Sequence, residues 1–446
     1  MLTIDTLCKL RALQMHGAIS SDDLHNWVVN AGKLLYIFYR VLINHSWSLY
    51  HSHCHHLEYI TMLRICLDAR NIKPVMTGLG RYALNLVRGI AELDSDNEYV
   101  LLKNPSYKDK IVDRPNFREV PVAGDTSSVR SFAMTATVVN RLNPDVYHAL
   151  RHFLPLALEC QRTIITLHDI MWIEAPELAF TNQFKALYNR HVKGRFIKHA
   201  VAHADIVVAI SEATQQKAID MLKVPPSKCR LIYPGIEEEF LKCDLVERNV
   251  GAAEPEQLKL RGRVGEHYII SLGTSRPYKN VDGTIRAFNL LKQHHPSLKL
   301  LIVGRGDRYP ALRSLVNELR LDDRVIFWSS IKDMKLTDSE LILLFKQARM
   351  LAFPSFLEGF GLPIVEAMAV GCPVLTSNVS APREIASDAA LLVDPYDVND
   401  IAAGMEKLLT DRALREELIV RGRKRAAQFT IDRCARATQA LYTAPL

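Results

Sequence analysis

The segment Glu358-Gly-Phe-Gly-Leu-Pro-Ile-Val-Glu366 carries the strongest structural signal in this chain of 446 residues. The apolar run 350–353 just before it predicts a short buried strand, and Pro363 fits the first position of a helix. Glu358 is therefore expected on a strand-to-helix loop, and Glu366 on the first turn of the helix. A strand, a glycine-rich loop and a helix in this order are typical of one βα unit in an α/β fold.

The composition of this loop suits a ligand that carries both hydroxyl groups and negative charge. Gly359 and Gly361 let the backbone approach a ligand closely, and the free N–H groups at a helix start favour an anion such as a diphosphate. The carboxylates of Glu358 and Glu366 can each accept hydrogen bonds from vicinal hydroxyls of a sugar ring. By spacing alone, a βα loop with two solvated glutamates is an equally good interpretation.

The segment resembles the E-x7-E signature of the retaining glycosyltransferases of family 4, and its continuation 367–374 resembles that family as well. The resemblance implies the GT-B fold, in which two Rossmann-like domains face each other across a cleft. It also implies that Glu358 contacts the transferred sugar and that Glu366 binds the ribose of the nucleotide. Further donor contacts are expected from the loop between them, at Gly359, Phe360, Gly361 and Leu362.

A basic loop, Gly273-Thr-Ser-Arg-Pro-Tyr-Lys-Asn280, follows another predicted strand. Cations at the carboxyl end of a strand can stabilise a diphosphate leaving group, and Arg276 and Lys279 are the candidates. The loop is similar to the G-x-x-x-P-x-K-N pattern of the family, whose basic residues bind the diphosphate. Many members have an arginine directly before the lysine, where this chain has Tyr278, so the match supports Lys279 better than Arg276. A solvated basic turn is the alternative.

The first half of the chain adds a second glycine loop, Met76-Thr-Gly-Leu-Gly-Arg-Tyr82, which follows the first predicted strand and opens a helix. Gly78 and Gly80 allow this loop to approach the phosphate side of the donor, as the corresponding loop of the family does. As a dinucleotide fingerprint it is only a partial match, because Ala83 fills the third glycine position.

His168 ends a predicted strand in the segment Thr166-Leu-His-Asp-Ile170. A lone histidine is more often structural than functional, but this one matches the H-D motif of the family. The match implies that His168 contacts the sugar or the acceptor. Further candidates for contacts are Asp169, Ser211 and, beside the base of the nucleotide, Ile331.

Short apolar strands alternate with helical patterns from Met62 onward, which predicts βα units and parallel sheets in both halves. We expect residues 1–61 to be an extension outside the catalytic fold, and 62–245 to form a Rossmann-like acceptor-side domain. A linker at 246–265 then leads to a nucleotide-sugar-binding domain at 266–446, whose last helix returns to the first domain. Strands are expected at 63–67, 99–103, 146–148, 163–167, 206–209, 230–232, 268–271, 299–303, 325–327, 350–353, 374–376 and 390–393.

The bulk composition is that of an ordinary soluble protein, with 48% hydrophobic and 24% charged residues. No run reaches the ~20 apolar residues of a membrane-spanning helix. The eight cysteines form no CxxC pair, which favours reduced thiols in the cytoplasm. The net charge of +7 suits an anionic nucleotide or membrane surface and lacks the dense basic tracts typical of nucleic-acid binding.

Three further patterns are weaker. Asp94-Ser-Asp96 has the form of a metal-binding D-x-D motif, but it lies in a polar turn, and we interpret it as surface. The cluster His51-Ser-His-Cys-His-His56 is interpreted as an incidental chelator. Basic and aromatic residues between 184 and 198 predict an amphipathic helix, and either a solvated face or docking on an anionic membrane accounts for them equally well.

The resemblance therefore implies a retaining hexosyltransferase that needs neither cofactor nor metal. The donor is a nucleoside-diphosphate sugar, with GDP-mannose favoured over UDP-glucose by general similarity to bacterial polysaccharide mannosyltransferases. The acceptor is a hydroxyl of a glycan or lipid-linked glycan, met in the cytoplasm or at the inner face of the membrane. A Rossmann-type oxidoreductase is disfavoured because Lys103-Asn104 replaces the expected ribose-binding acid. A non-catalytic subunit is disfavoured because His168, Lys279, Glu358 and Glu366 are all present.

Overall fold

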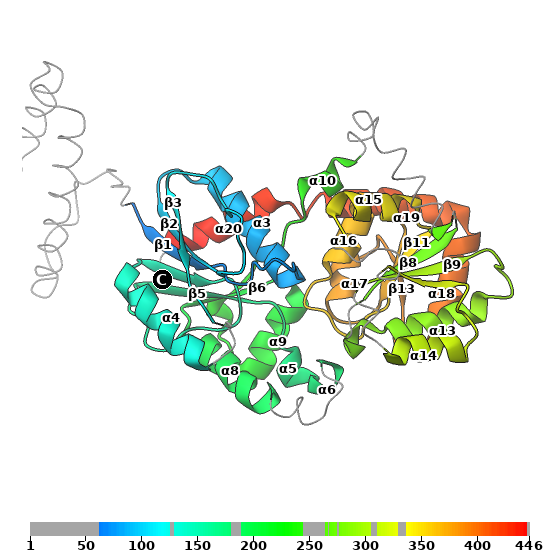
Figure 1. Cartoon of the computed structure of the whole chain (residues 1–446), viewed down its shortest axis with the longest axis horizontal. Helices are drawn as coiled ribbons and strands as arrows, with labels where there is room; N and C mark the ends of the chain where they lie inside the picture. The colour runs from blue at the N-terminus through cyan, green and yellow to red at the C-terminus, as the bar shows by residue number, and fades with distance from the viewer. Residues whose placement is uncertain are drawn as a thin grey trace, which may run out of the picture. The chain divides into compact units, whose positions relative to one another are not determined.

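A computed structural model describes residues 62–124, 129–179, 189–243, 264–265, 267–273, 276–304, 310–328 and 336–443. Residues 62–446 form one compact unit, which contains two parallel sheets with helices on both faces (Figure 1). Ile331 and nearly all of the predicted linker lie outside the described residues, as do the predicted extension and its histidine cluster. The two Rossmann-like domains predicted from the sequence are confirmed.

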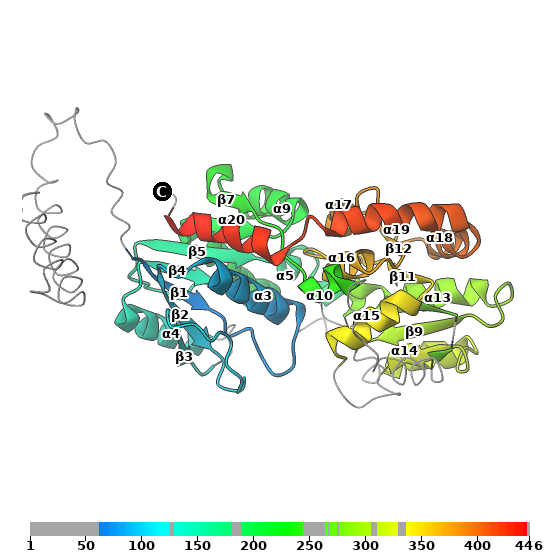
Figure 2. The ribbon, with the colours of Figure 1, turned by 90° about the horizontal axis from the view of Figure 1, so that it is seen from above.

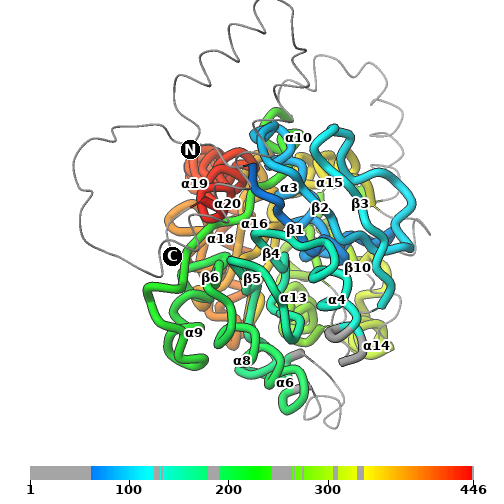
Figure 3. The backbone as a smooth tube through the Cα atoms, turned by 90° about the vertical axis from the view of Figure 1, so that its left-hand side faces the viewer, coloured from blue at the N-terminus to red at the C-terminus, as the bar shows by residue number. Residues whose placement is uncertain are grey.

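The first sheet has the order β3-β2-β1-β4-β5-β6-β7, and every neighbouring pair is parallel. Helices α3 and α20 cover one of its faces, and α4, α8 and α9 pack against the other, as Figure 3 shows from the side of this domain. The strands are β1 (Arg64–Asp68), β2 (Glu98–Lys103), β3 (Phe117–Pro121), β4 (Val146–Ala149), β5 (Arg162–Leu167), β6 (Ile206–Ala209) and β7 (Cys229–Leu231). The helices are α3 (Gly78–Leu93), α4 (Val129–Leu142), α5 (Met171–Glu174), α6 (Pro176–Ala179), α8 (Gly194–His203), α9 (Glu212–Leu222), α10 (Glu238–Leu241) and α20 (Ile431–Thr443).

The second sheet has the order β10-β9-β8-β11-β12-β13 and is also parallel. Its strands are β8 (Tyr268–Leu272), β9 (Lys299–Val303), β10 (Val325–Phe327), β11 (Met350–Phe353), β12 (Val374–Ser377) and β13 (Leu391–Val393). The short helix η3 (Pro277–Lys279) follows β8. The longer helices are α13 (Val281–Leu291), α14 (Pro310–Glu318), α15 (Asp338–Gln347), α16 (Leu362–Ala369), α17 (Ser380–Ala386), α18 (Val398–Thr410) and α19 (Arg412–Ala426).

All twelve predicted strands are present to within a residue or two at each end, and β3 is the strand that the sequence did not predict. Its sequence Phe-Arg-Glu-Val-Pro has only one buried residue, Phe117, because β3 is an edge strand. A second difference concerns Glu366, which lies on the second turn of α16 and not on the first. The helix begins at Leu362, directly after Gly361 with its left-handed φ of 105°.

The order of strands reverses between β1 and β4 in the first sheet, and between β8 and β11 in the second. In open parallel sheets, ligands bind outside the carboxyl ends of the strands at such a reversal. His168 follows β5, Lys279 follows β8 and Glu358 follows β11. The topology therefore places the predicted site residues at the edges where ligands of such sheets bind.

The chain returns to the first domain through its last helix (Figures 1 and 2). Helix α20 packs along α3, and the Tyr442 hydroxyl lies 3.0 Å from Nδ1 of the buried His148. The crossing passes Gly235, where an added Cβ would lie 2.3 Å from the backbone nitrogen of Ile431. One continuous apolar cluster extends from the α3 face of the first domain to the α15 and α16 face of the second. The returning helix α20 and the shared apolar cluster together join the two domains.

Replacing Gly235 by alanine should therefore destabilise the protein, because the clash is with backbone and no side chain can move away. We expect the free energy of unfolding to fall by about 1–3 kcal/mol, the usual cost of overpacking. Gly78→Ala is the matched control, since its Cβ would meet no atom within 4 Å. Chemical denaturation compares the two, and equal stabilities would contradict the tight crossing.

Candidate active site

The glycine loop of the second domain lies against the first domain at His168. A Cβ on Gly359 would lie 1.9 Å from the carbonyl oxygen of His168, a distance that excludes any side chain there. The Thr214 hydroxyl donates to the carbonyl oxygen of Gly359 at 3.3 Å and so holds the loop from the α9 side. Glycine at 359 is thus required by contact between the domains, and the contact brings Glu358 to the segment that carries His168.

Lys279 and Glu358 form an ion pair, with Nζ 2.7 Å from Oε1. Both side chains are largely buried, at 14% and 10% exposure, and the ammonium group also lies 4.7 Å from the ring centre of Phe353. Burial opposes the charge on Lys279, but the neighbouring Glu358 carboxylate outweighs burial and raises the pKa of Lys279. The site therefore contains a cation that stays charged beside a loop expected to bind phosphate.

Asn280 fixes the turn that presents Lys279. Its backbone is left-handed with a φ of 51°, a conformation that asparagine tolerates better than most residues. Its amide nitrogen donates to the carbonyls of Pro354 at 3.0 Å and Pro395 at 2.7 Å. The backbone N–H of Phe356 donates to the Tyr278 carbonyl at 2.8 Å. The Lys279 loop and the Glu358 loop are thus bound to each other before any ligand arrives.

His168 is 5% exposed, and its Nε2 lies 3.1 Å from the carbonyl oxygen of Leu150. Because a carbonyl only accepts, Nε2 carries the proton, which leaves Nδ1 as an acceptor. Burial lowers the pKa of His168 to about 4, so the ring is neutral near pH 7. The adjacent Asp169 accepts a hydrogen bond from the N–H of Met171 at 3.0 Å, and burial raises the pKa of its carboxyl group. His168 is therefore suited to accept a hydrogen bond and not to supply positive charge.

Glu366 is buried, with a side chain 3% exposed, and its partner is Arg81 of the first domain. Arg81 Nη1 lies 3.3 Å from Glu366 Oε1, and its other nitrogens bind Glu237 and Asp338. Burial raises the pKa of Glu366 to about 7, although Arg81 lowers it in part. The sequence pointed to Glu366 but gave Arg81 no role, since only the fold brings the two together. The one signal in the sequence that could have pointed to Arg81 was its position directly after Gly80, in the predicted glycine loop.

The other predicted residues take different places. Gly78 begins α3 in open space, whereas a Cβ on Gly80 would lie 2.8 Å from the carbonyl oxygen of Asn71. Ser211 is fully buried and caps α9, because its hydroxyl accepts the Thr214 N–H. Phe360 is 4% exposed. Gly80, Ser211 and Phe360 thus each have a structural role of their own.

Phe360 packs edge-on against Phe429, with ring centres 5.5 Å apart, and belongs to the core. Its side chain is therefore part of the core, and the donor contact predicted at this position would come from its backbone. Leu362, the first residue of α16, is partly exposed. Arg276 is exposed and stands directly before η3 with an extended backbone.

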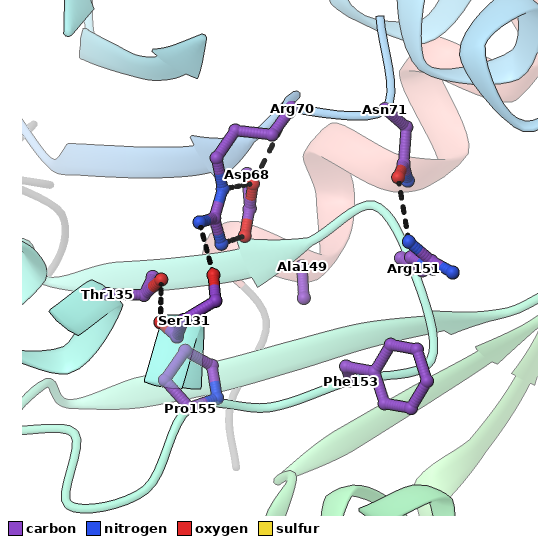
Figure 4. Close-up of a pocket in the computed structure, with 9 residues that line it drawn as sticks. All are labelled: Asp68, Arg70, Asn71, Ser131, Thr135, Ala149, Arg151, Phe153 and Pro155. Carbon is purple, nitrogen blue, oxygen red and sulfur yellow. Dashed lines mark hydrogen bonds and ion pairs between the residues drawn. The ribbon is translucent and has the colours of Figure 1, made fainter. Parts of the chain in front are cut away.

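A small polar pocket lies at the carboxyl ends of β1 and β4, where the first sheet reverses its strand order (Figure 4). Arg70 binds the Asp68 carboxylate through two nitrogens, at 2.8 and 2.5 Å, and its Nη1 donates to Ser131 at 3.2 Å. Across the pocket, Arg151 Nη1 lies 3.4 Å from the Asn71 side-chain oxygen. The pocket is lined by Asp68, Arg70, Asn71, Ser131, Thr135, Ala149, Arg151, Phe153 and Pro155. It is a polar site with a surplus of positive charge that the sequence did not predict.

No helix within the described residues is both long and apolar enough to cross a bilayer. Among the same residues, no group of three or more histidine, cysteine, aspartate or glutamate side chains is arranged to hold a metal ion. The Asp94-Ser-Asp96 turn has a local role. The Asp94 carboxylate accepts hydrogen bonds from the Asp96 N–H and from the hydroxyl of Tyr99.

Comparison with known proteins gives consistent matches over both domains. Residues 76–240 match the family model for glycosyltransferase family 4, and residues 254–425 match that for glycosyl transferases group 1. O-antigen chain mannosyltransferase B of Escherichia coli is 27% identical over 399 residues, which cover 85% of this chain and 99% of that protein. O-antigen chain mannosyltransferase RfbU of Salmonella typhimurium is 26% identical over 335 residues, which cover 72% and 84%.

Among solved structures, WaaG, a glycosyltransferase involved in lipopolysaccharide biosynthesis, is similar with a TM-score of 0.67 at 15% sequence identity. The similarity covers 86% of this chain and 100% of that one, and it shows the fold. One family match falls on each of the two domains that meet at Gly359 and His168. The chain therefore belongs to the glycosyltransferases with the GT-B fold, and bacterial O-antigen mannosyltransferases are among its relatives.

Proposed function

We propose that this glycosyltransferase transfers a hexose from a nucleoside-diphosphate sugar to a hydroxyl of a glycan or lipid-linked glycan, with retention of the anomeric configuration. The observation that carries the proposal is the buried Lys279–Glu358 pair at the segment of His168. GDP-mannose is the favoured donor, because the relatives with long matches are named as mannosyltransferases of O-antigen chains. The sugar would lie between Glu358 and His168, and the ribose on Glu366.

The mechanism follows from the charges of the site. When the bond between the sugar and the diphosphate breaks, negative charge develops on the phosphate, and Lys279 together with Arg276 would stabilise it. The departing phosphate would take the proton of the acceptor hydroxyl, which attacks from the same face of the sugar. Retaining glycosidases instead place two carboxyl groups about 5 Å apart on either side of the bond. The Glu358 carboxylate is paired with Lys279, which favours a role in orienting sugar hydroxyls over nucleophilic attack.

The acceptor would approach from the first domain. The pocket of Figure 4 lies at the strand reversal of that sheet, where ligands of such sheets bind. Arg70 is occupied by Asp68 and Ser131, but the partly exposed guanidinium group of Arg151 suits hydroxyl or phosphate oxygens of a glycan or lipid-linked glycan. Arg190, Arg195 and Lys198 are exposed near the beginning of α8, and we include in the proposal that they dock on an anionic membrane.

Two other functions fit less well. A Rossmann-type oxidoreductase would hold ribose with an acid at the end of β2, where this chain has Lys103, paired at 2.7 Å with Glu119. A non-catalytic subunit would have no need for a buried lysine beside a buried glutamate. A screen of GDP-mannose, UDP-glucose and NADH against a pooled glycan extract separates the three functions. We expect nucleoside diphosphate to be released from one sugar donor; NADH oxidation, or no turnover of any donor, would contradict the proposal.

Substituting the two glutamates should change different kinetic constants. Glu358→Ala should lower kcat by on the order of 10²-fold, because its contact with the sugar strengthens in the transition state. Glu366→Ala should mainly raise the donor KM, because ribose binding is shared by ground and transition states. Steady-state kinetics with acceptor present measure both, and Glu239→Ala, an exposed carboxylate on α10, is the control. If the kcat of Glu358→Ala stays within about threefold of the parent, the activation free energy has changed by less than roughly 0.7 kcal/mol. Glu358 would then not have its proposed role.

Divalent cations should be dispensable, because Lys279 and Arg276 would supply the positive charge that a metal supplies elsewhere. Turnover should therefore survive an excess of EDTA, measured as nucleoside diphosphate released after dialysis into metal-free buffer. A strict requirement for added Mg²⁺ or Mn²⁺ would contradict this part of the mechanism.

Substituting Arg151 should weaken the binding of the acceptor and leave the binding of the donor unchanged. Arg151→Met keeps most of the side-chain stem but removes the hydrogen-bond donors, so the acceptor KM should rise by on the order of tenfold. The donor KM should stay within about twofold of the parent. Arg141→Met, on the exposed surface of α4, is the matched control. An increase in donor KM alone would place the acceptor elsewhere.

A further inference from the structure

Arg81 connects one guanidinium group to carboxylates from three elements. It extends from α3 of the first domain and binds Glu237, which precedes α10, Asp338 of α15 and Glu366 of α16. The side chain is 19% exposed, and its guanidinium group lies 5.6 Å from the ring centre of Phe240. One positive charge therefore faces three acidic groups at the boundary between the two domains.

The three contacts of Arg81 are unequal. Its Nε lies 2.5 Å from Glu237, and its Nη2 makes an even closer contact with Asp338. The Nη1 contact with Glu366 is the longest, at 3.3 Å. Because a guanidinium group is planar and rigid, the two close contacts fix the direction of the third nitrogen. Glu237 and Asp338 thus hold Arg81 in place, and Arg81 in turn orients one oxygen of Glu366.

We propose that Arg81 is a positioning residue for the nucleotide: from the first domain, it holds Glu366 as an oriented carboxylate for the ribose hydroxyls of the donor. The inference rests on the proposed function, and it means that the ribose site is completed only when both domains are in contact. Arg81 itself need not touch the nucleotide. Its contribution is the direction and the charge of the carboxylate that does.

The surroundings of Glu366 explain why such a residue is needed. Its neighbours on α16 are the buried Ile364, Val365 and Met368, which offer no solvation for a charge. The pKa of Glu366 is raised to about 7, chiefly by burial and also by repulsion from Glu237 and Asp338. Arg81 acts in the opposite direction. Without Arg81 the group would be mostly a neutral carboxylic acid near pH 7, which is a poorer acceptor for two hydroxyl groups.

Nucleotide affinity should depend on the protonation state of Glu366. As the pH falls through about 7, Glu366 takes up a proton and nucleotide affinity should decrease. Removing Arg81 removes the influence that lowers the pKa of Glu366, so the decrease should begin at higher pH. Below its pKa, the ionised fraction of an acid falls about tenfold for each unit by which that pKa rises. A rise of one unit would therefore weaken binding roughly fivefold at pH 7 and close to tenfold at pH values well below 7.

The experiment is a calorimetric titration of the full chain with GDP and with UDP, at several values from about pH 6 to 9. The variants are Arg81→Met, Arg81→Lys and Glu366→Gln, with Arg88→Met as control because Arg88 is exposed on the same helix. We expect Arg88→Met to bind like the parent. Arg81→Met should bind roughly fivefold more weakly at pH 7 for a pKa one unit higher, with its pH profile displaced upward. Arg81→Lys should restore part of the affinity, and Glu366→Gln should lose the Glu366 component of the profile.

Two kinds of failure are distinguishable. If the parent binds GDP or UDP and Arg81→Met matches Arg88→Met in affinity and pH profile, the role of Arg81 is wrong while the proposed function stands. Tighter binding by Arg81→Met would likewise contradict it, because Arg81 would then compete with the nucleotide. If the parent binds neither nucleotide, the proposed function itself is contradicted. Should Arg81→Met not fold, Arg81→Lys decides, since an unchanged profile there would contradict the need for a rigid, forked cation.

Discussion

The close contact between Gly359 and the carbonyl oxygen of His168 is the constraint on which the site depends. There is no room for a side chain at 359, so the glycine loop of the second domain can lie directly on the segment that carries His168. With the loop in this place, Glu358 reaches Lys279 at 2.7 Å. The same arrangement holds α16 where Glu366 meets Arg81. A backbone contact between the domains thus decides which charged groups can act together.

The charges of the site are arranged by burial and pairing. Lys279 stays positive because Glu358 neighbours it, whereas the buried His168 is neutral, with a pKa lowered to about 4. Glu366 lies between these extremes, with a pKa raised by burial to about 7 and opposed by Arg81. Such a division suits sugar transfer, which needs a fixed cation for the leaving group and neutral or negative acceptors for sugar hydroxyls. One pair lies within the second domain, and the other joins the two domains.

The sequence predicted what depends on local pattern. Buried parallel strands read as short apolar runs, so the strands were found to within a residue or two; β3 was missed because an edge strand such as Phe117–Pro121 need not be apolar. The glycine loop with Glu358 and the loop with Lys279 were recognisable from their motifs. Arg81 and Arg151 were not, because their partners are distant in sequence and are brought near only by the fold. Ser211 also caps a helix and Phe360 also packs in the core, roles that a motif does not reveal, and their contacts with a ligand stay predictions.

A crystal structure of the full chain with a nucleoside diphosphate bound is the most direct test of the account. We predict that the diphosphate lies within hydrogen-bond distance of Lys279 and that the ribose hydroxyls lie on the Glu366 carboxylate. Arg81 should still be in contact with Glu366. The space for the sugar should then lie between Glu358 and His168. A nucleotide held instead by the loop of Gly78 and Gly80, with its phosphates away from Lys279, would contradict it.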